Sequence, residues 1–428
     1  MSRPGRTARI ALAGFLLAGI APPCLLWLFG WPSGWEPIRR WYLRHAGSDS
    51  WRPIRDALAY VTTHPSAGGL YEQTYWQSAY QFMYSPLSLL LVEWTEWPPF
   101  LEWRSHHSLN RLSWIVMLAV FGATALFCYR IARIAGPGPA TRGEAAGLAA
   151  LGVCASLFFY PLMYAYAIGQ IQTWLDLALI LALILWLAGH RVAVGVLIGL
   201  VCVVKVNVGA VLLWAVLRRQ WRFVGGFALV FALLGPAALM RYGWAVHAEY
   251  LDLLAHLSRR GESFVSNQSF NGLLNRAIFN GNNLEWDGTH QQIRLIGWVY
   301  AATLVSSLVL ILPSLWPWRG RGRLAGTADF AIALVTFSLA SPIAYEIHFG
   351  FLVPVFALAL VVLARADTPR AAWWGLGLAY ALCANRLSIT DALAPTYFNF
   401  LQSTMFFGLL ILLALLFRCR LVLAARAA

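Results

Sequence analysis

The stretch RVAVGVLIGLVCVVKVNVGAVLLWAVLRR, residues 191–219, holds two apolar runs that Lys205 separates and arginines enclose. The runs 192–204 and 206–217 contain no charged residue. Each is shorter than the roughly 20 residues that a helix needs to span the hydrocarbon core of a bilayer. The pattern predicts two short helices at membrane depth, with arginines in water on one side. Whether both runs cross the bilayer or form a tilted, partly re-entrant hairpin stays open at this stage.

Apolar runs bounded by arginine clusters recur along all 428 residues. Hydrophobic residues make up 60% of the chain and charged residues 12%, and the mean hydropathy is +0.63. Soluble domains carry about 25% charged residues, so a soluble globular protein is excluded. The composition predicts an all-α polytopic membrane protein, because a helix satisfies its own backbone hydrogen bonds in a bilayer. The net charge of +14 lies in clusters that follow the positive-inside rule, so we expect no nucleic-acid partner.

The runs and their basic flanks predict about twelve transmembrane helices in a single domain, residues 1–428. No small-x-small cleavage motif follows the first run, so we expect an uncleaved first helix. The six cysteines lie far apart, so we expect no disulfide framework. The predicted crossings lie near 10–30, 113–134, 146–161, 171–188, 192–204, 206–217, 223–241, 293–315, 327–345, 349–364, 372–387 and 401–418.

Two long stretches, 31–112 and 242–292, are expected as external loops. Their content of Trp, Tyr and Leu predicts short interfacial helices, one of them over 244–257, where apolar residues recur at helical spacing. We expect the chemistry on this external side, because the acidic residues gather there: Glu36, Asp49, Asp56, Glu72, Glu93, Glu96, Glu102, Glu249, Asp252, Glu262, Glu285, Asp287, Glu346 and Asp391.

Lys205 is the only lysine of the chain. A charge at the centre of a membrane helix costs at least about 2.5–3.5 kcal/mol, so we expect it to be paired or functional. The functional hypothesis is an ammonium that contacts a lipid phosphate, and the alternative is a side chain that snorkels to water. Asp176 lies in another apolar run and needs a partner for the same reason, either an interior arginine or Lys205.

Asp56 follows the first predicted helix closely enough to rest at the outer interface, with Tyr60 one turn later. A carboxylate among short apolar neighbours can have a raised pKa and act as a general base. The alternative is an ordinary surface ion pair with Arg52 or Arg55. Spacing alone does not decide between the two.

Glu346 and His348 follow Ser341-Pro342 at the external end of a predicted helix. Their alternate spacing can bring them near one pocket, where a histidine can carry a proton or donate to a phosphate near neutral pH. The alternative for the histidine is a helix cap. We expect no metal site, because the Asp, Glu and His residues lack tight ligand spacing.

A polar block, SNQSFNGLLNR at 266–276, interrupts the second external stretch. Asn267-Gln268-Ser269 matches a glycosylation motif, but the Arg- and Ala-rich composition is typical of a high-GC bacterium, so we discount a glycan. The simplest interpretation is a serine that caps a short helix. The functional hypothesis is a hydrogen-bonding surface for a sugar, with the guanidinium of Arg276 directed at a phosphate.

These blocks occur in an order that resembles the polyprenol-phosphate-sugar-dependent glycosyltransferases of family 87. That family belongs to the GT-C class, which includes the phosphatidylinositol-mannoside mannosyltransferases. The pieces that carry the resemblance span about residues 50–350: Asp56-x-x-x-Tyr60, Gly69-Leu70-Tyr71, Tyr84-Ser85-Pro86, Gly169-Gln170, Gly199 to Lys205 with Arg218-Arg219-Gln220-Trp221-Arg222, Asn267-Gln268-Ser269-x-x-Gly272-Leu273-Leu274, and Ser341-Pro342 with His348.

Three positions depart from the family pattern. Gln172 stands where the family usually has Asn, Val206 where it has Pro, and Ile347 where it often has a first histidine. These departures indicate a divergent member of the family and leave the identity of its sugar open.

The resemblance implies an inverting transfer of a hexose, with mannose expected, from a polyprenyl-phosphate donor to a lipid or glycan acceptor. The expected place is the external face of a bacterial plasma membrane. Neither a cofactor nor a metal is implied, since the lipid-linked sugar is itself the co-substrate. The implied roles are catalytic base for Asp56, donor-phosphate binding for Lys205, Arg276 and His348, and substrate binding for Tyr60, Tyr84, Gln170, Asn267, Gln268, Ser269 and Glu346.

Two other classes of function stay open. A flippase or transporter of lipid-linked sugars requires polar residues along a path through the bilayer. The expected polar blocks gather instead at one face, apart from Lys205 and Asp176. A non-catalytic partner subunit would tolerate the loss of Asp56.

Overall fold

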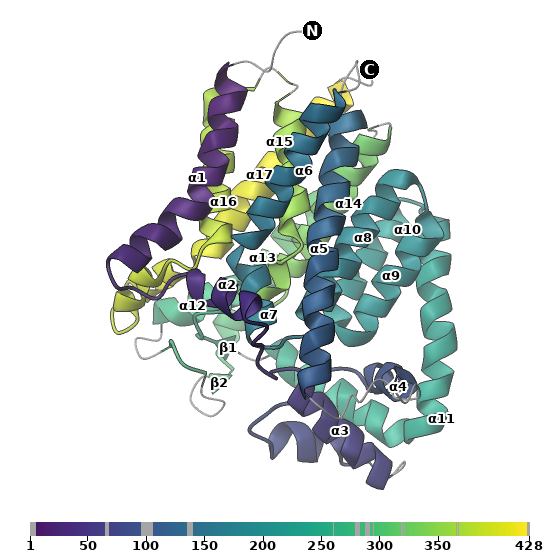
Figure 1. Cartoon of the computed structure of the whole chain (residues 1–428). Coiled ribbons are helices and arrows are strands. Elements are labelled where there is room, and N and C mark those ends of the chain that lie inside the picture. The colour runs from purple at the N-terminus through teal and green to yellow at the C-terminus, as the bar shows by residue number, and fades with distance from the viewer. Residues whose placement is uncertain are drawn as a thin grey trace.

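The computed structural model describes residues 6–64, 68–95, 106–134, 140–259, 261–278, 283–286, 292–293, 295–317, 320, 322–364, 366 and 368–425. Figure 1 shows an assembly of long helices with both chain ends at one end of the molecule and the short elements at the other. Two-residue strands β1 (Gly261–Glu262) and β2 (Gln292–Ile293) pair antiparallel at that second end.

The helices follow the apolar runs closely. In chain order they are α1 (Arg6–Leu28), α2 (Trp35–Tyr42), α3 (Trp51–Thr63), η1 (Glu72–Trp76), α4 (Pro86–Thr95), α5 (His106–Ile134), α6 (Arg142–Leu157), α7 (Tyr160–Ala167), α8 (Gln172–Ala188), α9 (Arg191–Val204), η2 (Val206–Ala210), α10 (Val211–Leu217), α11 (Trp221–Arg259), α12 (Phe270–Ile278), α13 (Gly297–Leu315), α14 (Arg323–Leu339), η3 (Glu346–Phe349), α15 (Leu352–Leu363), α16 (Arg370–Ala384), η4 (Ser388–Leu393), η5 (Asn399–Gln402) and α17 (Thr404–Ala425).

In the described part of the chain, four helices are long and apolar enough to cross a membrane: Ser108–Ile134 in α5, then α11, α13 and α17. The pair α6 and α7, bent by 51°, makes a fifth if it is one span. Other apolar helices, among them α8, α9 and α15, are shorter than this. The all-α membrane class is therefore supported, whereas the predicted number of twelve crossings is not confirmed.

Four helices depart from the predicted boundaries by more than four residues. α5 begins at His106, so the first expected loop ends earlier than residue 112. α11 continues through the expected interfacial helix 244–257, with a kink at Gly243, whose φ of 77° breaks the helical geometry. α14 ends at Leu339 rather than 345, because the following Ser341-Pro342 cannot continue the helix. α17 runs on to Ala425, so Arg418 and Arg420 lie inside it.

Glycines allow α9 and α11 to pack closely. A Cβ atom on Gly195 would lie 2.1 Å from the Phe223 carbonyl oxygen, and one on Gly226 would lie 2.2 Å from the Val192 carbonyl oxygen. Small residues at such a crossing are typical of helix pairs in membranes, where close backbone contact replaces the hydrophobic driving force. This crossing fixes α9, at whose end Lys205 lies.

The end of the molecule that carries the chain termini is held by a buried ion pair. Arg218 follows α10, and its Nε donates to Asp329 Oδ2 of α14 at 2.8 Å. The indole of Trp214 donates to the same oxygen at 3.1 Å. Since a buried charge is costly without a partner, this pair ties α10 and α14 together.

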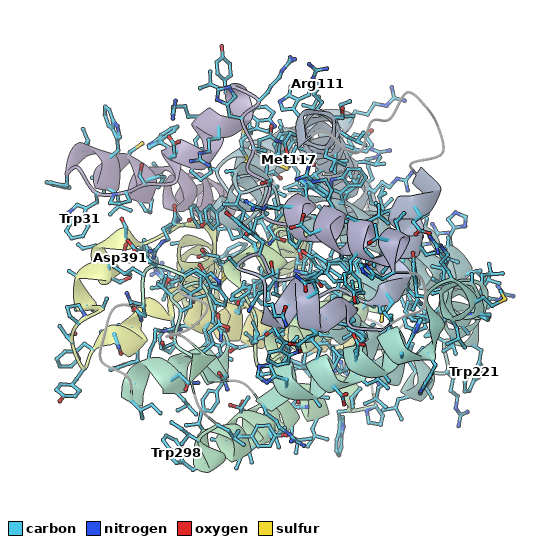
Figure 2. All side chains as sticks on the ribbon, turned by 90° about the horizontal axis from the view of Figure 1, so that it is seen from below. Trp31, Arg111, Met117, Trp221, Trp298 and Asp391 are labelled. Atoms are coloured by element: carbon cyan, nitrogen blue, oxygen red, sulfur yellow. The ribbon has the colours of Figure 1, made fainter. Side chains whose placement is uncertain are left out.

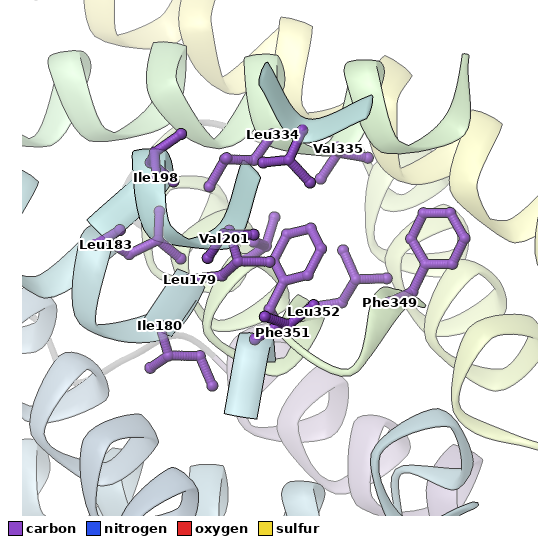
Figure 3. Packing of buried hydrophobic residues seen from close by; sticks show 14 of the residues in the cluster. Leu179, Ile180, Leu183, Ile198, Val201, Leu334, Val335, Phe349, Phe351 and Leu352 are labelled. Carbon is purple, nitrogen blue, oxygen red and sulfur yellow. The ribbon is translucent and has the colours of Figure 1, made fainter. Parts of the chain in front are cut away.

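The interior between α8, α9, α14 and α15 is apolar. Figure 3 shows Leu179 and Leu183 of α8 against Ile198 and Val201 of α9, with Leu334 of α14 close by. Viewed from the end with the short elements, Trp221 and Trp298 lie at the rim of the assembly (Figure 2), and they are 62% and 56% exposed. Apolar side chains therefore cover the outside as well as the core, as a lipid-facing surface requires.

Candidate active site

The candidate site forms where two backbone segments cross. Gly47, between α2 and α3, lies against Gly169, between α7 and α8, and the Asp49 amide donates to the Ile168 carbonyl at 3.0 Å. A Cβ atom on Gly169, whose φ is +75°, would sit 2.1 Å from the Gly47 carbonyl oxygen. Only glycine permits this approach. The crossing brings Asp49 next to Gln170.

Asp49 and Gln170 are hydrogen-bonded, with the Gln170 amide donating to the carboxylate. Ser50 supports the pair: its hydroxyl donates to Gln170 Oε1 at 2.9 Å and accepts from the Ile171 amide at 3.0 Å. The Tyr84 hydroxyl lies 2.7 Å from the same Ser50 oxygen. A network from three segments of the chain therefore orients the Asp49 carboxylate.

Lys205 lies at the break between α9 and η2, where the two apolar runs meet. Its ammonium donates to Gln172 Oε1 at 2.6 Å, and the Gln172 amide donates in turn to Asp176 Oδ1 at 2.8 Å. Among the described residues, Asp176 therefore pairs with no arginine and has no direct contact with Lys205. Gln172 links the two side chains by hydrogen bonds. An ammonium has three N–H groups, so two remain for a ligand.

A cavity of about 530 Å³ opens between these segments and the second half of α11, a size that suits a small ligand. Its polar lining includes Asp49, Gln170, Lys205, Ser266 and His348. Aromatic rings form much of the remaining wall, including those of Tyr84, Tyr164, Tyr250, Trp286 and Tyr345. Among the described residues that line the cavity, Asp49 is the only carboxylate and Lys205 the only cation.

Burial shifts the pKa values of Asp49 and His348 in the cavity wall. It raises the pKa of Asp49 above its usual 3.8, although the Gln170 hydrogen bond and the charge of Lys205 oppose the rise. Burial also lowers the pKa of His348 well below 6.5, and the positive charge of Lys205 adds to this. The imidazole is therefore neutral near pH 7, so it offers a hydrogen bond rather than a positive charge.

Asn267 and Gln268 hold backbone segments together. Asn267 pairs with Tyr345 in an isolated antiparallel bridge, and its Oδ1 accepts from the Ala344 amide at 3.1 Å. Gln268 Oε1 accepts from the Met405 amide at 3.1 Å. Neither side chain belongs to the cavity lining. Their contacts brace the loop before η3, and substrate contact by these two residues stays a prediction.

The two serines of the polar block have different positions. Ser269 caps α12, as the simplest interpretation predicted: its hydroxyl accepts from the Gly272 amide at 3.1 Å and donates to the Pro342 carbonyl at 2.7 Å. Ser266 lines the cavity, and its hydroxyl donates to Glu346 Oε1 at 3.0 Å. Glu346 lies behind this wall, where burial raises its pKa, and it does not line the cavity.

Arg276 is fully buried, at 0% exposure, away from the cavity lining. Its guanidinium donates to the carbonyls of Phe264 and Asn267, both at 2.9 Å, and to the Ser403 hydroxyl at 2.6 Å. These contacts join α12 to the start of α17. The placement gives no support to the expected contact with a donor phosphate.

Asp56 and Tyr60 lie on α3, outside the cavity lining. The buried face of this helix includes Ile54, Ala57 and Leu58, and helical spacing directs Asp56 to the exposed side. The Tyr60 hydroxyl donates to the Gly68 carbonyl at 2.8 Å and so holds a neighbouring turn. The structure thus separates Asp56 from Lys205, although the sequence had placed both at one site.

The sequence pattern did not single out Asp49, the carboxylate that lines the cavity, which was counted only among the external acidic residues. Two signals were present. Asp49 belongs to a short polar segment, Gly47-Ser48-Asp49-Ser50, directly before an amphipathic helix. A second glycine, Gly169, precedes Gln170 at the start of another helix. Neither signal reveals that the two glycines touch, because the contact joins segments far apart in the chain.

A metal site requires several ligating side chains in a particular arrangement. Among the described residues, no group of three or more His, Cys, Asp and Glu side chains is arranged to hold a metal ion. Chemistry without a metal ion stays a prediction from the sequence.

The membrane-length helices, together with a cavity that one oriented carboxylate and one lysine line, define a helical membrane protein with a polar site at one end. The sequence model of glycosyltransferase family 87 matches residues 82–342, more than half of the chain. The chain belongs to this family of GT-C membrane glycosyltransferases. The match includes Gln170 and Lys205, whereas Asp49 and His348 lie outside it. Searches of curated proteins and of solved structures give no match.

Proposed function

We propose that this chain is an inverting hexosyltransferase that takes its sugar, mannose, from a polyprenyl phosphate and transfers it to a lipid or glycan acceptor. The observation that carries the proposal is one cavity, at the end of an apolar helix assembly, that both Lys205 and Asp49 line. A lipid-linked sugar phosphate has one anionic group and a long apolar chain, which such a cavity suits. Glycosyl transfer is the activity of the family.

The proposed reaction uses Asp49 as general base. An acceptor hydroxyl attacks the anomeric carbon and loses its proton to the Asp49 carboxylate, while the bond from that carbon to the phosphate oxygen breaks. The products are a new glycosidic bond and polyprenyl phosphate. Asp49 supports this role because Gln170 orients it and burial raises its pKa, which strengthens it as a base. The leaving phosphate needs no second carboxyl group to protonate it, unlike the leaving group of a glycosidase.

Lys205 is proposed to bind the donor phosphate. The leaving group gains negative charge in the transition state, and a fixed cation in a desolvated site stabilises that charge. Two of its N–H groups are available, since Gln172 takes one. His348 is proposed to add a neutral hydrogen bond to the same group, because its imidazole lines the cavity and is uncharged.

The cavity lies at the end of the molecule opposite the chain termini, near α11 and the short elements. Arginine-rich segments, including Arg218 after α10, lie toward the other end. If these arginines face the cytoplasm, as the positive-inside rule predicts, the site faces outward. We therefore propose a multi-pass protein of a bacterial plasma membrane with its site on the external side.

The test is a transfer reaction with purified protein in liposomes. The liposomes contain a polyprenyl phosphate that carries radiolabelled mannose, and a lipid extract as the source of acceptor. A parallel set of liposomes contains polyprenyl phosphates that carry other hexoses. The expected result is protein-dependent appearance of label in a new lipid or glycan with inverted anomeric configuration. If the intact donor changes leaflet and no sugar leaves it, the transporter alternative replaces this proposal.

A further inference from the structure

A polar chain leaves the cavity and enters the apolar core. It runs from Lys205 to Gln172 and from Gln172 to Asp176, which lies one turn further along α8. Asp176 is 0% exposed and Gln172 2% exposed. A carboxylate in this position is costly, and a leucine would serve the packing of an apolar helix better. Packing alone therefore does not explain the aspartate.

The surrounding backbone makes room for this carboxylate. A Cβ atom on Gly350 would lie 2.1 Å from Asp176 Oδ2, so any larger residue at that position would displace the side chain. Gly350 directly follows η3, the turn that carries His348. Asp176 thus packs between the helix that begins at Gln172 and the turn that supplies another cavity residue.

The amide of Gln172 transmits the effect of Asp176. Because its Nε2 donates to Asp176 Oδ1 at 2.8 Å, its Oε1 must face the other way, where it accepts from Lys205 at 2.6 Å. A carboxylate only accepts hydrogen bonds and an ammonium only donates them, so each end of the chain fixes the orientation of the amide between them.

We propose that Asp176 is a positioning residue that acts through Gln172 to direct the Lys205 ammonium into the cavity and to keep it protonated before a ligand binds. The role rests on the proposed function, in which this ammonium receives the donor phosphate. Three ionisable groups act on Lys205 from the elements around it: Asp176 on α8, Asp49 before α3 and His348 on η3. Of these, Asp176 is the only one joined to it by a chain of hydrogen bonds.

The single lysine provides a test that needs no substrate. Lys205 and the α-amino group are the two amines of the chain that an amine-reactive reagent can modify. Acetic anhydride modifies the neutral amine and not the ammonium. Mass spectrometry of the modified peptides, measured across pH, therefore reports two quantities for Lys205. The limiting rate of labelling at high pH reports how accessible the Lys205 amine is to the reagent. The pH of half-maximal labelling reports the pH at which that amine loses its proton.

The decisive variant is Asp176→Asn, which keeps the size and can still accept from Gln172. Loss of a unit charge a few ångströms away should lower the pH of half-maximal labelling by about one unit. At pH values well below both midpoints, labelling of Lys205 then rises about tenfold relative to the α-amine, at an unchanged limiting rate. A merely structural defect would change the limiting rate instead.

Two further variants complete the experiment. Adding Gln172→Glu to Asp176→Asn returns a carboxylate to the chain next to Lys205, and it should restore or exceed the wild-type midpoint. Asp329→Asn removes another buried carboxylate, in the ion pair with Arg218 near the opposite end, and should leave the midpoint unchanged. The proposal fails if Asp176→Asn leaves the midpoint unchanged, or if Asp329→Asn shifts it equally. A shifted midpoint in a protein that transfers no sugar supports the pairing and contradicts the proposed function instead.

Discussion

Gly169→Ala should disable the site while leaving the fold in place. The new Cβ atom would lie 2.1 Å from the Gly47 carbonyl oxygen, whereas ordinary contacts begin at 3.4 Å. The two backbones must therefore separate by about 1.3 Å, and a misplacement of about 1 Å at a reacting group can lower a rate about 100-fold. Asp49 lies two residues from Gly47, so its carboxylate moves with the segment. We expect kcat for sugar transfer to fall about 100-fold.

Gly189→Ala is the matched control. Gly189 caps the other end of α8 with a φ of +95°, but no atom lies within 4 Å of the position of its Cβ. Both variants carry the strain of a left-handed alanine, about 1–2 kcal/mol each, and only Gly169→Ala carries the clash. Transfer kinetics and thermal melting of both purified proteins separate the two effects. Wild-type turnover in Gly169→Ala, or an equal loss in both variants, would refute the reasoning about the crossing.

Three further predictions concern individual side chains. Lys205→Met should raise the KM for a polyprenyl-phosphate sugar about tenfold or more, because it removes the only cation among the described residues that line the cavity. An unchanged KM in steady-state kinetics would count against the phosphate role. Arg276→Met should cost about 3 kcal/mol of stability, since three acceptors, two of them in buried hydrogen bonds, lose their donor. A lower melting temperature with an unchanged donor KM is the expected result, and the reverse would favour a phosphate contact. Transfer should fall on acidification through the pKa of Asp49, which burial holds above 3.8, because the protonated carboxyl cannot act as a base; a pH profile of kcat/KM without an acid limb above that value would contradict this.

The positions of the helices followed from the sequence with few errors. Uncharged runs end at arginines, and most boundaries lie within a few residues of the prediction, as for α8 and α9. Membrane helices are predictable in this way because the bilayer penalises charge directly along the chain. The end of α14 was placed at residue 345, where the uncharged stretch ends, whereas the helix ends at Leu339, before Pro342.

The site was only partly predictable. Lys205 was found because a lone charge between apolar runs is rare. Gln170 was found because Gly169-Gln170 is one of the pieces that resemble the family, although α8 begins only at Gln172. Asn267 and Gln268 were assigned to a sugar on the basis of residue type and of the family resemblance. Their partners are backbone atoms of distant segments, such as the Met405 amide, and no local pattern encodes such contacts. Residue type indicated hydrogen bonding but not its target.

The choice between Asp49 and Asp56 shows the same limit. Both lie in the first external stretch, and Asp56 has the more suggestive neighbours in sequence. What favours Asp49 is the contact between Gly47 and Gly169, which is a tertiary feature. Asp56 lies on the exposed face of α3 because Ile54 and Ala57 lie on the buried face. Which face of α3 is buried depends on the segments that pack against it, and the sequence does not show these.

The central claim is that transfer takes place in the cavity of Lys205 with Asp49 as the base. The most direct measurement is the single-turnover rate of sugar transfer by Asp49→Asn and Asp56→Asn, compared with wild type in the same liposomes. The account predicts that Asp49→Asn lowers the rate by about 100-fold or more, while Asp56→Asn, altered at an exposed position, stays within about twofold of wild type. Loss of transfer in Asp56→Asn together with a normal rate in Asp49→Asn would contradict it.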